Sequence, residues 1–181
     1  MTYDERENKS WPVPHLISVI AFETCTVLFF IYLINNETGY AGLLDNFNLI
    51  IHEAGHVVFN FLGHTMHLLG GTLLECIVPI AFLISFWRTK QPMGVAFSGI
   101  WLGENFIYIS YYILDAMPMR LPLLGGARSI HDWNAILGGM GLLHHYKFIG
   151  GTVFVIGWLI MISSAIWYFL RWFLYYGQEE H

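Results

Sequence analysis

Long apolar runs separated by short polar segments dominate this sequence of 181 residues. A helix needs about 20 mostly apolar residues to cross the hydrocarbon core of a bilayer. Five runs approach or exceed that length and predict transmembrane helices: residues 15–34, 46–63, 68–87, 93–117 and 148–176. The last run is longer than the core is thick, so we expect that helix to tilt or to emerge into the interface.

A sixth and shorter element is predicted between the fourth and fifth spans. Residues 118–129, PMRLPLLGGARS, are rich in Pro and Gly and predict a loop. Residues 131–143 have a polar start and several glycines, and we interpret them as a short helix or half-helix. The sequence thus predicts an all-α fold. It is a polytopic transmembrane bundle of about five spans and one half-helix, with residues 1–181 forming a single membrane domain.

The composition agrees with a membrane location. Hydrophobic residues make up 56% of the chain and charged residues only 12%, whereas about a quarter of the residues of a soluble domain are charged. Aromatic residues reach 17%, and Tyr and Trp favour the membrane interface. We therefore expect a multi-pass integral protein surrounded by lipid, in a bacterial-type inner (cytoplasmic) membrane. The net charge of −5 and the lack of a basic patch argue against a nucleic-acid partner.

One apolar run carries three titratable side chains within five residues, in the motif HEAGH at residues 52–56. Residues four apart lie on the same face of a helix, so His52 and His56 can bind one metal ion. Glu53 lies about 100° round the helix, where it can reach a water on the metal. Zinc accepts imidazole ligands and activates such a water, and an adjacent carboxylate can take its proton. The motif therefore predicts one zinc ion, with Glu53 as the catalytic residue.

A structural interpretation of the same residues stays open. Ionisable side chains inside a span are costly and suggest function by default, but His52, Glu53 and His56 could also pair with polar groups on neighbouring helices. The same helix face continues to Asn60. Its amide could hydrogen-bond the ligating histidines or a substrate.

The segment HEAGHVVFNFLG, in a hydrophobic helix, resembles the site-2-protease family of intramembrane zinc metalloproteases. This resemblance implies that His52 and His56 are zinc ligands and that Glu53 is the catalytic base. It also implies a third ligand, an aspartate from a later segment near Pro and Gly. The family's Asp-Gly pair is absent as such, and the nearest counterpart, LPLLGGARSIHDWNAILGG, offers Asp132.

Several side chains compete for the position of the third ligand. Asp132 is our first choice and His131 the second, because both open the half-helix after the loop; the other candidates are Glu75, Glu104 and Asp115. Asp132 also fits the S-x-x-D capping pattern with Ser129, which would give it a purely structural role. Glu104, with Asn105 beside it, either pairs helices or positions protons or substrate. Gly99 and Gly103 on the same helix predict a packing face.

Two classes of function follow from these residues. The first is a zinc-dependent peptidase that cleaves membrane-embedded or membrane-associated peptides. The second is a non-enzymatic subunit that assembles with partner subunits in a membrane complex, and its metal site would then be structural, a zinc closed by four ligands. Further histidines at 64, 67, 144 and 145 leave a membrane di-iron or haem protein as a third interpretation.

Overall fold

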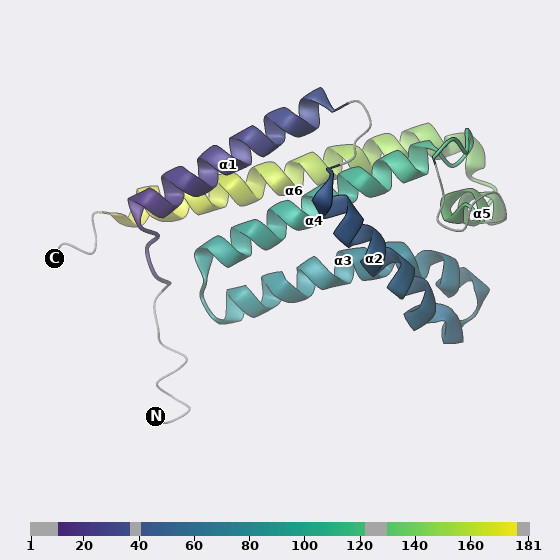
Figure 1. The fold of residues 1–181 in the computed structure, drawn as a ribbon, viewed down its shortest axis with the longest axis horizontal. Coiled ribbons are helices and arrows are strands. Elements are labelled where there is room, and N and C mark those ends of the chain that lie inside the picture. The colour runs from purple at the N-terminus through teal and green to yellow at the C-terminus, as the bar shows by residue number, and fades with distance from the viewer. Residues whose placement is uncertain (1–10, 37–40, 122–129, 177–181) are drawn as a thin grey trace.

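The computed structural model describes residues 11–36, 41–121 and 130–176, and these ranges contain helices and no strand. The elements in chain order are α1 (Leu16–Asn35), α2 (Leu43–Phe59), the 3-10 turn η2 (Asn60–Leu62), α3 (His64–Arg88), α4 (Pro92–Leu114), α5 (Asp132–Gly139), the 3-10 turn η4 (Leu143–His145) and α6 (Tyr146–Tyr175). The predicted all-α fold is confirmed (Figure 1). Residues 122–129 of the predicted Pro/Gly loop lie outside the described residues.

Glycines account for two of the largest differences from the predicted helix bounds; a third of equal size is the end of α2, which lies at Phe59 rather than at residue 63. Gly63 has a φ of 98°, a backbone conformation that favours glycine, and α3 begins directly after it rather than at residue 68. The short helix predicted over 131–143 ends at Gly139. Its glycine-rich end has low helix propensity, and Gly141, with a φ of 70°, turns the chain into η4.

Three helices are long and apolar enough to cross a membrane, which indicates a membrane protein: Leu16–Asn35, His64–Arg88 and Leu143–Tyr175. The predicted count of about five spans is not confirmed, because α2 and α4 do not meet both criteria. Helix α2 has 17 residues and carries several polar side chains. Helix α4 is long enough, with 23 residues, but polar and small residues, including Glu104 and Asn105, interrupt its apolar run. It packs against both α3 and α6.

Helix α4 packs on α6 through small residues. A Cβ added at Gly99 would meet the Ser164 hydroxyl, and one added at Gly103 would meet Met161 and the Gly157 carbonyl. The prediction that Gly99 and Gly103 form a packing face is thus confirmed. Close backbone approach of this kind is typical of helix pairs in membranes.

Helix α2 crosses α3 at a second glycine contact (Figure 1). A Cβ on Gly55 would lie 2.2 Å from the Gly70 carbonyl oxygen, and one on Gly71 would lie 2.4 Å from the His52 ring. Helix α5 packs against α3 and α4. The three elements that carry HEAGH, Glu75 and Asp132 therefore meet at one place in the bundle.

Candidate metal centre

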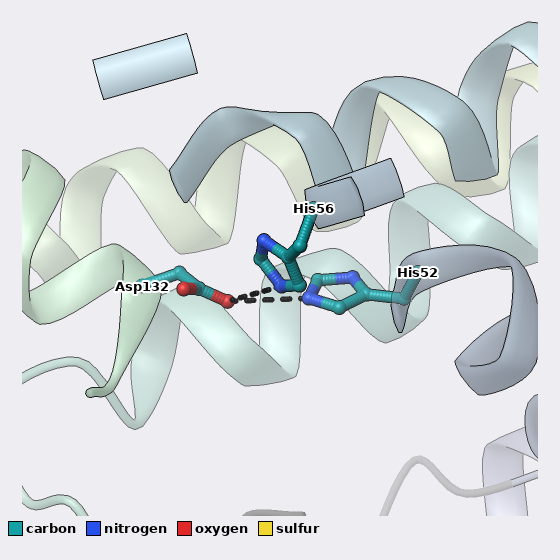
Figure 2. Close-up of side chains that lie close together, drawn as sticks. All are labelled: His52, His56 and Asp132. Carbon is teal, nitrogen blue, oxygen red and sulfur yellow. Dashed lines mark hydrogen bonds and ion pairs between the residues drawn. The ribbon is translucent and has the colours of Figure 1, made fainter. Parts of the chain in front are cut away.

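Three side chains that the sequence singles out converge on one point. One ligand atom each from His52, His56 and Asp132 lies within 4.8 Å of the others. The Asp132 Oδ2 atom is 3.2 Å from His52 Nε2 and 3.4 Å from His56 Nε2. Figure 2 shows both imidazole rings turned toward the carboxylate. The two histidines come from α2 and the aspartate from the first residue of α5, 80 positions beyond His52 in the chain.

The other nitrogen of each imidazole is held by the protein. His56 Nδ1 donates to the His67 carbonyl oxygen at 2.7 Å, and His52 Nδ1 lies 3.1 Å from Glu75 Oε2. An Nδ1–H that donates to an oxygen leaves the lone pair of a neutral ring on Nε2. When the rings are neutral in this tautomer, both lone pairs would be available to a cation beside Asp132 Oδ2; when a ring carries a proton on Nε2 instead, that proton is donated to the same oxygen.

Asp132 is fixed at both its backbone and its side chain by Tyr112 of α4. The Tyr112 hydroxyl donates to Asp132 Oδ2 at 3.1 Å and accepts from the Asp132 N–H at 3.2 Å. Burial alone would raise the pKa of Asp132, but hydrogen bonds from His52 and His56 outweigh it and hold that pKa well below its usual range. Asp132 is therefore a carboxylate, the form that binds cations.

The geometry of the cluster fits a metal ion. Ligand atoms at zinc–nitrogen and zinc–oxygen distances lie about 3.3 Å apart in a tetrahedral site, close to the 3.2 Å and 3.4 Å separations found here. Two imidazoles and a carboxylate are also a donor set that divalent transition metals accept. His52, His56 and Asp132 could hold one metal ion.

Two predicted site residues lie outside this cluster and are exposed. Glu53 follows His52 on α2 and forms no hydrogen bond or ion pair with any residue in the described ranges. Asn60 begins η2, at the end of the HEAGH helix. Its predicted contact with the ligating histidines does not occur here.

His131, the second choice for the third ligand, has a structural contact at each ring nitrogen. Its Nδ1 accepts from the Asn134 N–H and caps α5, while its Nε2 lies 3.4 Å from Asp115 Oδ2. Burial lowers the pKa of His131 despite the nearby Asp115 carboxylate. The cap of α5 is thus His131, and Ser129, proposed as the capping residue, lies outside the described residues.

Glu104 and Asn105 are both fully buried, one layer behind the cluster. The Asn105 side-chain amide donates to the Glu75 carbonyl oxygen, so it supports the helix turn that carries Glu75. Glu104 Oε2 accepts from the Asn48 amide at 3.0 Å. Neither residue contacts the three converging side chains directly.

Sequence reasoning missed the Tyr112 hydroxyl, and it considered Glu75 only as a possible ligand. A lone acid in the apolar run of α3 marks Glu75 as unusual, but its partner, His52, lies 23 residues away. Nothing in the local sequence distinguishes Tyr112 from its neighbours Tyr108 and Tyr111.

Comparison with protein-family models, with curated proteins and with solved structures finds no match to this chain. The function is therefore argued from the residues of the site.

Proposed function

We propose that this protein is a membrane-embedded, zinc-dependent peptidase that cleaves membrane-associated peptides. One observation carries the proposal: Asp132 Oδ2 lies 3.2 Å from His52 Nε2 and 3.4 Å from His56 Nε2, and one ligand atom from each of the three residues lies within 4.8 Å of the others. The motif HEAGH supplies two of these ligands, together with an acid next to them in the chain.

The number of ligands favours a catalytic over a structural zinc. A catalytic zinc has three protein ligands and an open position, whereas a structural zinc is closed by four. Within the described residues, the group that could hold a metal has three members. A zinc ion held by them would polarise the scissile carbonyl and make a water molecule acidic enough to react near neutral pH.

Glu53 is the proposed general base. It is exposed and follows the buried His52 on α2, and in the proposed mechanism its carboxylate turns toward a water at the edge of the cluster. Glu53 takes one proton as the water oxygen bonds to the carbonyl carbon. When the C–N bond breaks, Glu53 returns that proton to the leaving amine. The hydroxyl of the water thereby ends on the new carboxyl group, and its other proton ends on the new amine.

The substrate is proposed to be a peptide in, or next to, a bacterial-type inner membrane. A peptide bond within a helix is shielded by its own backbone hydrogen bonds, so the segment must unwind before its carbonyl can be attacked. Three candidate spans place the cluster in a membrane protein, where a membrane-anchored substrate would be concentrated near the site.

The test combines metal content with cleavage in one set of variants. We expect wild-type protein in detergent to contain zinc and to cut fluorescein-labelled casein or a membrane-spanning model peptide in liposomes. Glu53→Gln is expected to retain zinc and to lose cleavage, because it removes the base but no ligand. Glu23→Gln on α1 is the matched control and should retain both.

Cleavage unchanged by Glu53→Gln would contradict the mechanism. Tightly bound zinc without cleavage, in a protein that co-purifies with other membrane proteins, would favour the non-enzymatic subunit with a structural metal.

A further inference from the structure

Glu75 lies on the far side of His52 from the converging ligand atoms. Its Oε2 atom is 3.1 Å from His52 Nδ1, while His52 Nε2 lies 3.2 Å from Asp132 Oδ2. The imidazole is therefore held between two carboxylates, one at each nitrogen. Glu75 itself is 1% exposed and belongs to α3, a candidate membrane span.

A polar side chain buried at that depth needs a hydrogen-bond partner. Within the described residues, the side-chain partner of Glu75 is His52 Nδ1, and the other carboxyl oxygen, Oε1, has no hydrogen-bond partner there. The buried carboxyl group is therefore satisfied through the His52 ring.

Surrounding residues fix the positions of Glu75 and His52 relative to each other. The Asn105 amide donates to the Glu75 carbonyl oxygen. Gly71, one turn before Glu75 on α3, leaves room for the His52 ring, because a Cβ there would lie 2.4 Å from His52 Nε2. The orientation of the ring is thus set from α3 and α4, not from α2 alone.

We propose that Glu75 is a positioning residue for the metal centre. Its Oε2 atom accepts from His52 Nδ1 and so leaves the lone pair of that ring on Nε2, beside Asp132 Oδ2. This inference rests on the metal site of the proposed function, but it does not require peptide cleavage.

General chemistry supports this assignment. A ligating histidine usually donates its other ring N–H to a carboxylate or a carbonyl, and loss of such a partner typically weakens metal binding about 10–100-fold. Here the two histidines use different partners, a carboxylate for His52 and a carbonyl for His56.

The test compares two buried glutamates. Glu75→Gln and Glu104→Gln both neutralise a carboxyl group that is at most 1% exposed, but only Glu75 contacts a proposed ligand. Zinc affinity is measured by chelator competition on detergent-purified protein, and the ligand field is read from the visible spectrum of the Co²⁺-substituted protein. We expect Glu75→Gln to bind zinc about 10–100-fold more weakly and to shift the Co²⁺ bands, with both unchanged in Glu104→Gln.

Equal zinc affinity in wild type and Glu75→Gln, or equal weakening in both variants, would overturn the inference. If Glu75→Gln does not fold, Glu75→Asp retains the carboxyl group with a shorter reach. It should bind zinc with a shifted Co²⁺ spectrum, and a spectrum identical to wild type would contradict the role. Weakened zinc binding in Glu75→Gln, in a protein that cleaves no peptide, would leave this inference standing and refute only the peptidase.

Discussion

The two halves of helix α2 both bury polar side chains, but they connect them differently. In the first half, Asp45 and Asn48 are fully buried. Asn48 accepts from Trp101 Nε1 at 2.8 Å and donates to Glu104, while Asp45 accepts from the Ala41 N–H and lies close enough to interact with Glu104. In the second half, the HEAGH histidines each present a nitrogen to the Asp132 carboxylate.

The contrast shows that polar burial alone does not identify a site. The first-half cluster consists of amides and acids whose hydrogen bonds link α2 to α4, so it anchors the helix. The second-half cluster also anchors each histidine, but through Nδ1, and the remaining nitrogens converge with a carboxylate. Convergence of unshared lone pairs separates a binding site from a structural network.

The largest difference in bound zinc between the two halves of α2 is expected when one of the three converging side chains is removed. His56→Ala leaves two of the three ligands, and we expect bound zinc to fall from near-stoichiometric to undetectable after dialysis. Asn48→Ala, one half-helix away, should retain the metal. Metal analysis of the two purified variants measures the zinc content. Equal zinc in both would mean that the second half of α2, like the first, only holds the helix in place.

A smaller effect is expected when a ligand is displaced rather than removed. A Cβ on Gly71 would lie 2.4 to 2.6 Å from three atoms of the His52 ring, so the ring must move in Gly71→Ala. We expect zinc affinity to fall by about 10–100-fold, as on loss of an orienting partner. Gly151→Ala on α6, where a Cβ meets nothing within 4 Å, is the control for chelator competition. An unaffected Gly71→Ala would show that His52 is not held against this helix.

Substitutions in the first-half cluster of α2 should change the stability of the protein rather than its metal binding. Asn48→Ala leaves Trp101 Nε1 and Glu104 Oε2 buried without their hydrogen bonds. We expect a loss of about 1–3 kcal/mol in the free energy of unfolding, measured by denaturant titration in detergent micelles. Thr152→Ala, at an exposed position on α6, should change stability by less than about 0.5 kcal/mol. If Asn48→Ala lost the metal and kept its normal stability, the first-half cluster would bind the metal and would not anchor the helix.

The smallest expected effect concerns the residue that holds Asp132. Tyr112→Phe removes one donor to Oδ2 and one acceptor for the Asp132 N–H, and we expect zinc binding to weaken by about 1 kcal/mol. Tyr111→Phe is a neighbouring control on the same helix, where the ring packs against Phe154 of α6. Isothermal titration calorimetry with zinc compares the two variants. An equal effect in both would show that the Tyr112 hydroxyl does not support the metal site.

Local sequence pattern was sufficient for the helices and for much of the site. Apolar runs predict five of the helices in the described residues, because helices that are buried or face lipid are rich in apolar residues, and the polar start after the Pro/Gly loop predicts α5. Helical spacing pairs His52 with His56, and Asp132 at the start of the short helix is the preferred third ligand. The structure places it beside both histidines.

Other features depend on contacts between helices and have no local pattern. Glu75 meets His52, and Tyr112 meets Asp132, across helix interfaces that the sequence does not specify. The predicted count of about five spans stays unconfirmed, because α2 is short and α4 interrupts its apolar run with polar residues such as Glu104 and Asn105.

The most direct test of the metal site is the X-ray absorption spectrum of wild-type protein at the zinc edge, after purification without chelators. We predict four nitrogen or oxygen ligands at about 2.0–2.1 Å, with the outer-shell scattering of two imidazoles. Absence of zinc, or a first shell that contains sulfur, would contradict the claim that His52, His56 and Asp132 form a zinc centre.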